Sequence, residues 1–297
     1  MLKPLGKGGM GSVYLARQVS LDRSVALKTL NAEWASDPGF VSRFVREAYA
    51  AAQLTHHNVV QIYELGRDGN VNYFSMEYVH GGSLGDKLRK AGKLPADEAV
   101  RFIIQAANGL RFAHDRGMVH RDIKPDNLMV NDEGIVKVAD LGLVKTKGVS
   151  VEEDAGGGKG KRTGDGSGLG ALPDVTRVGS AMGSPSYMAP EQCRDATTVD
   201  GRADIYSLGC TLYALIAGRT PFQGKTAVEV ISNHLNEPPP PLARAAPQVS
   251  RDLGAIVDRT LAKDPADRFQ SMGEFVGALR GGRRRAGREW AGRRKSN

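Results

Sequence analysis

Two short strings near the middle of the chain combine acidic, basic and amide side chains at close spacing. In "HRDIKPDN" (120–127), Asp122 could accept a proton from an attacking hydroxyl, and Lys124 could neutralise a transferring phosphoryl group. Asn127 and the Asp140 of "ADLG" offer hard oxygen ligands to a divalent cation such as Mg²⁺. A candidate base, a cation and metal ligands in this order predict a site that transfers phosphoryl groups.

The stretch "LGKGGMGSVYLA" is rich in glycine, and Gly6, Gly8 and Gly11 fit the pattern G-x-G-x-x-G. The motif alone fits a dinucleotide-binding unit, a loop over ATP phosphates or a flexible surface turn. Apolar and polar residues then alternate on both sides of a turn at 21–23, which predicts two antiparallel strands. A dinucleotide-binding glycine loop leads into a helix, so this pattern favours a cover for ATP phosphates.

Two further residues could orient the phosphates. The string "VALK" places Lys28 in the second predicted strand, where its ammonium could reach them. Helical periodicity covers residues 39–53, and Glu47 on that helix could pair with Lys28 and fix its direction. A lone strand lysine is usually a surface residue, but beside the other candidates it predicts a phosphate anchor.

Composition and length describe an ordinary soluble globular protein. The chain has 297 residues, of which 40% are hydrophobic and 25% charged, enough for one large domain or two smaller lobes. Cys193 and Cys210 lie far apart, which favours a reducing compartment over a disulfide framework. No apolar run reaches the roughly 18–20 residues that span a bilayer, and nothing resembles a signal peptide. We therefore expect a cytoplasmic location.

The net charge of +8 is concentrated at one end of the chain. Residues 281–297 contain six Arg and one Lys against one Glu, and Trp290 is almost their only apolar side chain. We expect a disordered basic tail, since like charges repel and little can be buried. The remainder carries only +2, so no specific nucleic-acid partner is expected. Weak contact of the tail with an anionic membrane surface is the alternative.

The order of patterns along the chain predicts a small β-rich lobe followed by a larger helical one. Strand-like patterns near 59–65 and 71–79 follow the first helix, Gly81–Gly82 interrupts the chain, and the pattern from Ser83 onward is mostly helical. Residues 147–171 are rich in Gly and small polar residues and almost lack apolar ones, which predicts a disordered insertion.

Three more strings complete a recognisable set: "GSPSYMAPE" (183–191), "DIYSLG" (204–209) and "KDPADRF" (263–269). Together with the earlier motifs they resemble protein kinases of the eukaryotic-like (Hanks) type, from about residue 3 to residue 280. The string "GKGGMGSVYLA" in particular resembles the bacterial serine/threonine kinases.

The resemblance implies the α+β bilobal protein-kinase fold in a domain covering residues 1–280. Its small antiparallel β-rich N-lobe, with one main helix, would cover about 1–79, and its larger, mainly helical C-lobe about 80–280. The insertion at 147–171 would then lie in the activation loop, and 281–297 would follow the domain as a tail.

The resemblance also implies roles for individual residues. The glycine-rich backbone would cover the phosphates, apolar side chains would enclose adenine, and backbone groups of Glu77 and Val79 would bind its edge. The implied ATP-binding residues are Gly6, Lys7, Gly8, Gly9, Gly11, Val13, Ala26, Lys28, Met76, Glu77, Val79 and Met129. The implied catalytic residues are Asp122, Lys124, Lys28 and Glu47, with Asn127 and Asp140 as ligands of Mg²⁺, for which Mn²⁺ could substitute.

Other residues match structural or regulatory positions. His120 would pack beneath Leu141 and would not act as a base, while Glu191 would pair with Arg268. The family commonly has Phe at the position of Leu141 and Thr at that of Ser184. The Leu141 side chain would keep the apolar contact, and the Ser184 hydroxyl could still bridge Asp122 and Lys124.

Arg121 directly precedes Asp122, and in the family this arrangement requires a phosphate on the activation loop. We therefore expect autophosphorylation, with Thr176 first and Ser180 second, which could involve a transient homodimer.

The sequence thus predicts an enzyme that transfers the γ-phosphoryl group of Mg-ATP to Ser or Thr hydroxyls of protein substrates. One alternative is an inactive pseudokinase scaffold of the same fold, although the Lys, Glu, two Asp and Asn that such scaffolds often lack are all present here. A small-molecule kinase of related fold would lack "GSPSYMAPE". In a third alternative, the basic tail at 281–297 carries the function and binds nucleic acid or a membrane surface.

Overall fold

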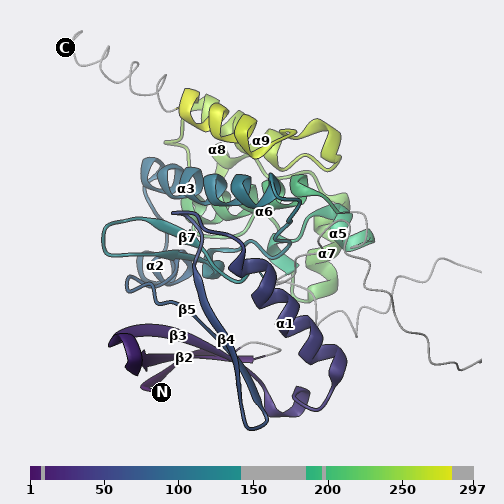
Figure 1. Ribbon diagram of the computed structural model, residues 1–297. Coiled ribbons are helices and arrows are strands. Elements are labelled where there is room, and N and C mark those ends of the chain that lie inside the picture. Colours follow the sequence, from purple (N-terminus) through teal and green to yellow (C-terminus); the bar gives the residue numbers. More distant parts are fainter. Residues whose placement is uncertain (8–10, 142–184, 196–198, 283–297) are drawn as a thin grey trace, which may run out of the picture.

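The computed structural model describes residues 1–7, 11–141, 185–195 and 199–282, apart from the side chains of Arg43 and Glu47. Within these residues the chain forms a small lobe built on a β-sheet and a larger lobe built mainly of helices (Figure 1). The α+β architecture expected from the order of sequence patterns is therefore confirmed.

The small lobe contains one five-stranded antiparallel sheet with the strand order β1-β2-β3-β5-β4. Its strands are β1 (Lys3–Lys7), β2 (Gly11–Gln18), β3 (Arg23–Leu30), β4 (Ile62–Asp68) and β5 (Val71–Glu77). The β2–β3 pairing runs in register from Gly11 opposite Leu30 to Gln18 opposite Arg23. The two antiparallel strands expected after the glycine-rich stretch are confirmed, since that stretch leads directly into β2.

The expected strand at 59–65 is displaced, because β4 begins only at Ile62. Val59 instead forms a parallel bridge with Val138, and the N–H of Val60 donates to the Val138 carbonyl at 2.9 Å. Val138 belongs to the larger lobe, so these residues tie the two lobes together. An apolar run alone does not tell which partner strand it will meet.

Helix α1 (Pro38–Ala52) packs along the sheet of the small lobe (Figure 1). Its N-cap is Asp37, whose carboxylate accepts hydrogen bonds from the N–H groups of Gly39 and Phe40 at 2.8 and 3.3 Å. On its inner face the buried Phe44 ring lies against Phe74 of β5, with ring centroids 5.1 Å apart. The helix expected at 39–53 is thus present, and apolar packing holds it on the sheet.

The larger lobe is organised around helix α6. Its elements are α2 (Leu84–Ala91), α3 (Ala96–His114), β6 (Leu128–Val130), β7 (Val136–Val138), α5 (Pro190–Arg194), α6 (Gly201–Ala217), α7 (Ala227–Asn236), α8 (Leu242–Ala245) and α9 (Arg251–Thr260), and residues 272–282 are also helical. Every residue of α6 from Ala203 to Ile216 is buried. Among the described residues, no helix is long and apolar enough to cross a membrane.

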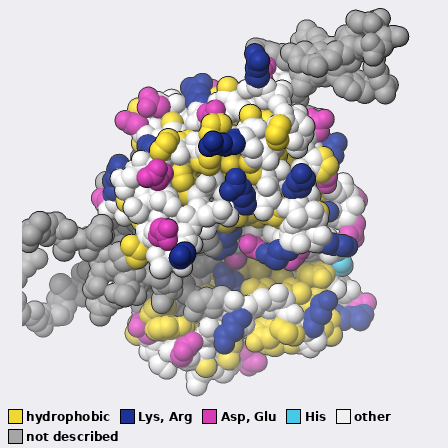
Figure 2. Space-filling model, turned by 180° about the vertical axis from the view of Figure 1, so that it is seen from behind, with side chains coloured by type: hydrophobic (Ala, Val, Ile, Leu, Met, Phe, Trp, Pro, Cys, Tyr) yellow, Lys and Arg dark blue, Asp and Glu magenta, His cyan; other side chains and the backbone are white. Residues whose placement is uncertain are grey.

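The surface carries charges of both signs. Lys and Arg side chains are spread over the face shown in Figure 2 and lie among Asp and Glu side chains. The basic tail at 281–297 is described only as far as residue 282, so the expectation about it lies largely outside the described residues.

Helix α7 contributes a fully buried histidine, His234, to the larger lobe. Its ring lies against Phe222, with centroids 4.7 Å apart, and its Nδ1 is 2.8 Å from the Tyr206 hydroxyl. Burial and the nearby Lys263 ammonium lower the pKa of His234 to about 4. The imidazole is therefore neutral in the folded protein near neutral pH.

We expect the buried His234 to make the fold acid-sensitive. Its folded pKa of about 4 is below the ordinary 6.5, so the unfolded chain takes up the proton first as the pH falls. Its contribution is complete above pH 6.5 and is lost as the pH falls through 4, in total on the order of 3 kcal/mol. Urea unfolding across this range should show a flatter pH dependence for His234→Phe. Equal slopes in the wild-type protein and His234→Phe would contradict this account.

Candidate active site

The loop between α3 and β6 brings three of the predicted residues into direct contact. The Asp122 carboxylate accepts hydrogen bonds from Lys124 Nζ at 2.9 Å and from Asn127 Nδ2 at 3.2 Å. The same Asn127 nitrogen donates to the Asp122 carbonyl at 2.7 Å. These contacts fix the carboxylate and use the amide nitrogen of Asn127, so the amide oxygen is the atom of Asn127 that could ligate a metal.

A buried carboxylate from α6 holds this loop in place. Asp204 is fully buried and accepts hydrogen bonds from the backbone N–H groups of His120 and Arg121, both at 2.8 Å. It also lies 2.8 Å from His114 Nε2. Burial alone would raise the pKa of Asp204, but these hydrogen bonds and the His114 ring hold the pKa below its ordinary value. The non-glycine Arg121 is held at φ 67°, a conformation that these contacts support.

Asp204 is a positioning residue that the sequence patterns do not predict. The string "DIYSLG" belongs to the set that resembles protein kinases, and the resemblance as described above gives no role to its aspartate. An acidic residue at the start of a mostly apolar segment is the available signal, since a buried carboxylate requires partners.

His120 has the structural role that was expected. The residue is completely buried, its Nε2 lies 2.9 Å from the Ala139 carbonyl, and its Nδ1 accepts from the Asp122 N–H at 3.3 Å. The ring therefore links the loop at 120–127, called the catalytic loop below, to strand β7, which leads into Asp140. Both ring nitrogens are occupied by backbone groups, which leaves neither to act as a base.

Asp140 joins the site from the end of β7. The Ala139 N–H donates to the Asn127 carbonyl at 2.9 Å, which brings the residue before Asp140 against the catalytic loop. Asp140 has φ 55°, and its carboxylate accepts from Lys28 Nζ of β3 at 3.0 Å. The Lys28 charge lowers the pKa of Asp140 below its ordinary value. A cation of the small lobe and a carboxylate of the larger lobe therefore meet at the lobe interface.

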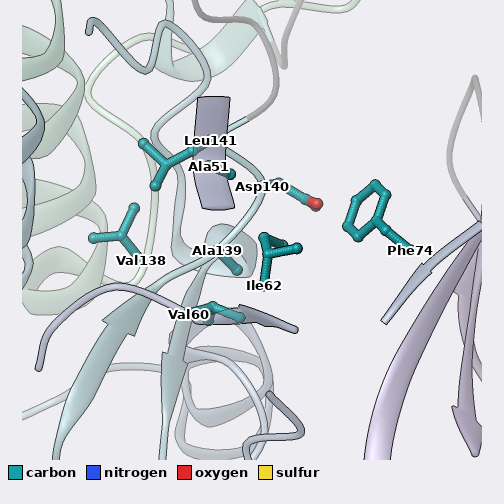
Figure 3. Close-up of a pocket in the computed structure, with 8 residues that line it drawn as sticks. All are labelled: Ala51, Val60, Ile62, Phe74, Val138, Ala139, Asp140 and Leu141. Atoms are coloured by element: carbon teal, nitrogen blue, oxygen red, sulfur yellow. The ribbon is translucent and has the colours of Figure 1, made fainter. Parts of the chain in front are cut away.

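A small cavity of about 20 Å³ lies behind Asp140 (Figure 3). Its walls come from both lobes, and the Asp140 carboxylate points away from Ala139 toward the Phe74 ring (Figure 3). The lining residues are Ala51, Val60, Ile62, Phe74, Val138, Ala139, Asp140 and Leu141. A space of this size holds a water molecule at most, so a nucleotide would have to lie on the other side of Asp140.

The residues predicted to enclose adenine gather in one apolar cluster. Ala26 of β3 is opposite Met76 of β5, and both are buried together with Val79. Val13 and Met129 are partly buried and pack against the same cluster. Strands of the small lobe and β6 of the larger lobe thus supply facing apolar walls.

The backbone N–H and carbonyl groups of Glu77 and Val79, beside this cluster, differ in whether they could form a hydrogen bond to a base. The N–H of Glu77 donates to the Gln61 carbonyl at 2.8 Å, so a base could meet the carbonyl of Glu77 but not its N–H. Val79 is buried, yet within the described part of the chain neither its N–H nor its carbonyl makes a hydrogen bond to a protein group. Buried backbone groups normally have partners, which makes Val79 a suitable contact for the edge of a base.

Several predicted residues fall outside what the structure describes. Gly8 and Gly9 of the glycine-rich loop lie in the gap at 8–10, and the activation-loop candidates Thr176 and Ser180 lie in the gap at 142–184. Glu47 is in α1, but its side chain is not among those described. The roles of these residues stay predictions. Lys7 and Gly6 lie in β1, at the edge of the sheet beside the loop.

The two described glycines of the motif have different steric surroundings. A Cβ at Gly11 would lie 2.3 Å from the Thr29 carbonyl oxygen of β3, whereas a Cβ at Gly6 would meet nothing within 4 Å. Backbone atoms cannot yield as a flexible side chain can. Gly11 is therefore required for the close pairing of β2 and β3, and Gly6 is not.

We expect Gly11→Ala to weaken ATP binding by roughly tenfold, because β2 must move away from β3 at the point where the glycine-rich loop ends. Titration of ATP and thermal unfolding would measure the effect. The matched variant Gly6→Ala should change both quantities little. Equal behaviour of the two variants would refute this distinction.

The arrangement fits a metal held mainly by a substrate. Among the described residues no group of three or more His, Cys, Asp or Glu side chains gathers into a metal site. Asp140 and Asn127 provide one carboxylate and one amide oxygen beside the Lys28 ammonium. Mg²⁺ is typically bound by one or two carboxylates together with substrate phosphates and water, and this donor set suits it.

Residues 1–276 match the family described as the protein kinase domain. The chain is 38% identical over 275 residues to the serine/threonine-protein kinase PknB of Mycobacterium leprae, covering 91% of this chain and 40% of that protein. It is 36% identical over 279 residues to the probable serine/threonine-protein kinase CPE1738 of Clostridium perfringens, covering 94% and 37%. The chain thus spans about two fifths of the length of these curated relatives.

A crystal structure of the Mycobacterium tuberculosis PknI kinase domain, solved as a point mutant, superposes with a TM-score of 0.66 at 28% sequence identity. The superposition covers 94% of this chain and 93% of that one. ATP and a divalent metal are the cosubstrate and cofactor that this family uses. The two curated relatives carry the names of bacterial serine/threonine-protein kinases, and the chain belongs to the protein kinase family.

Proposed function

We propose that this protein transfers the γ-phosphoryl group of Mg-ATP to Ser or Thr hydroxyls of protein substrates. One observation carries the proposal: the Lys28–Asp140 pair and the Asp122–Lys124–Asn127 cluster lie side by side, joined by the bond from the Ala139 N–H to the Asn127 carbonyl. Phosphoryl transfer is catalysed mainly by positioning and charge stabilisation, and these groups supply both.

Each residue contributes a distinct part of the mechanism. The Lys28 ammonium anchors phosphate oxygens. The oxygens of Asn127 and Asp140 would hold Mg²⁺, which when bound would supply neutralisation of the phosphate charge. The Asp122 carboxylate orients the acceptor hydroxyl and takes its proton. Lys124, already 2.9 Å from that carboxylate, offsets the charge that develops on the transferring group.

A phosphate-transfer assay on a generic basic protein with radiolabelled ATP tests this proposal. We expect label on the substrate with Mg²⁺ and none after chelation, and acid hydrolysis should release phosphoserine or phosphothreonine. Asp140→Asn should abolish the transfer, and the exposed Asp132→Asn should preserve it. A wild-type protein that binds ATP but transfers nothing would establish the pseudokinase alternative. Label on tyrosine alone would refute the serine/threonine assignment.

Regulation by autophosphorylation is a second part of the proposal. Arg121 Nη2 donates to the Val199 carbonyl at 3.1 Å, and burial lowers the pKa of Arg121 below its ordinary value. The negative charge of a phosphate on Thr176 or Ser180 would stabilise the positively charged guanidinium of Arg121. Phosphopeptide mapping after incubation with ATP should find Thr176 first and Ser180 second. Phosphate confined to residues 147–171 would contradict that choice.

We propose a cytoplasmic kinase domain that autophosphorylates through a transient homodimer and whose basic tail weakly contacts anionic membrane surfaces. Sedimentation with anionic vesicles, compared between the full chain and a chain lacking 281–297, tests the tail. Equal sedimentation of the two chains would show that the tail does not contact anionic membrane surfaces.

A further inference from the structure

One arginine on the rim of the active site bonds to two carboxylates at once. Arg89 of α2 donates from Nη1 to Asp126 Oδ1 and from Nη2 to Asp86 Oδ1, both at 2.7 Å. Asp126 lies on the catalytic loop, between Lys124 and Asn127. The Arg89 guanidinium therefore neutralises an acidic group only four residues from Asp122.

The surrounding backbone is shaped for this contact. A Cβ at Gly85 would lie 2.4 Å from Asp126 Oδ1, so the absence of a side chain lets the carboxylate approach α2. Asp86 is held by a capping box, in which it accepts from the Ser83 N–H at 2.9 Å. Two carboxylates thus occupy fixed positions, with Arg89 between them.

The pair faces the segment that leads into α5. Burial and neighbouring charges raise the pKa of Tyr187, in the 3₁₀ turn Pro185–Tyr187, and among those charges Asp126 raises it while Arg89 lowers it. The pair itself joins α2 to the catalytic loop four residues from Asp122, the residue that the acceptor hydroxyl of a protein substrate must reach.

The contact contributes little to folding. The side chains of Arg89, Asp86 and Asp126 are 61%, 61% and 47% exposed, and ion pairs with such exposure contribute between nothing and about 1 kcal/mol. The charges instead shape the field that a substrate meets. Helix α2 carries Lys87, Arg89 and Lys90 against the single Asp86, so with Asp126 neutralised this rim is net positive.

We propose that Arg89 is a specificity-determining residue that prevents selection of basic residues next to the acceptor hydroxyl. By occupying Asp126 and Asp86, its guanidinium takes the place that a substrate Arg or Lys would otherwise fill. The site then accepts neutral or acidic flanking residues in preference to basic ones. This inference rests on the proposed kinase activity and concerns which proteins that activity selects.

Matched peptides provide the test. A peptide series with one acceptor, carrying Arg or Gln at each flanking position in turn, gives a ratio of kcat/KM values for each position. Arg89→Gln should raise the Arg-to-Gln ratio at one or two positions by about fivefold, the effect expected of one partly exposed ion pair. Added salt should reduce the gain.

Three variants isolate the cause. Arg89→Lys should keep the wild-type ratio, and Lys90→Gln, which removes a neighbouring exposed charge on α2, should raise it by a smaller factor than Arg89→Gln does. Asp126→Asn added to Arg89→Gln should remove the gain. An unchanged ratio in Arg89→Gln, or an equal loss for all peptides, would overturn the inference and make the contact a structural tie. A wild-type protein that phosphorylates no peptide or protein would overturn the proposed activity instead.

Discussion

Replacing Asp122 with asparagine is expected to lower kcat by roughly 10²–10⁴-fold, the usual contribution of a positioned base, while ATP still binds. The amide oxygen of an asparagine could still accept the hydrogen bonds from Lys124 and Asn127, so the loop should keep its shape. The variant loses only the group that takes the proton of the acceptor hydroxyl. Steady-state kinetics would give kcat, and calorimetric titration would give the ATP dissociation constant.

The control for Asp122→Asn is Asp132→Asn, the same chemical change in the exposed turn between β6 and β7. It should leave kcat and ATP affinity at the wild-type values. Unaltered turnover in Asp122→Asn would remove Asp122 as the base. Loss of ATP binding in that variant would show that the carboxylate supports the nucleotide site instead of the chemistry.

Replacing Arg268 with methionine is expected to destabilise the larger lobe by about 3–5 kcal/mol, as found when one partner of a buried ion pair is removed. Arg268 is completely buried and donates to both oxygens of Glu191 at 2.8 Å, which confirms the predicted pair. It also donates to the carbonyls of Ala262, Arg202 and Lys263 at 2.7, 3.1 and 2.9 Å. Methionine fills much of the volume but removes every hydrogen bond that these acceptors receive from Arg268.

Urea unfolding measures this loss, and Arg17→Met is the matched control. Arg17 pairs with Asp22 at the small-lobe surface, where the two side chains are 61% and 71% exposed, so its loss should cost less than about 1 kcal/mol. Similar destabilisation in both variants would show that burial does not strengthen the Glu191–Arg268 pair. Because Glu191 lies in the first turn of α5, at the end of the "GSPSYMAPE" string, Arg268→Met should also lower activity before global unfolding.

The sequence predicted the site well where local spacing determines geometry. Asp122, Lys124 and Asn127 lie within six residues on one loop, so their contact follows from chain connectivity. The alternation in β2 and β3 likewise predicted a hairpin that puts Lys28 on the strand opposite Val13. Such short-range patterns give the same answer in almost any folded context.

Contacts between distant segments could not be predicted in this way. Asp204 supports the backbone of Arg121 from 83 residues away, and Arg89 reaches Asp126 across 37 residues. Neither distance leaves a periodic signal in the sequence. Helix α6 shows the same limit, because a helix buried on all sides lacks the polar face that periodicity detects.

The central claim is that one pocket between the lobes holds a single nucleotide with its terminal phosphate among Lys28, Asn127, Asp140 and Asp122. A crystal structure with Mg²⁺ and a non-hydrolysable ATP analogue tests it most directly. The account predicts adenine between Ala26 and Met129, phosphate oxygens at the Lys28 ammonium, and metal contacts to the side-chain oxygens of Asn127 and Asp140. A nucleotide bound elsewhere, or phosphates in this pocket without metal contact to either residue, would contradict it.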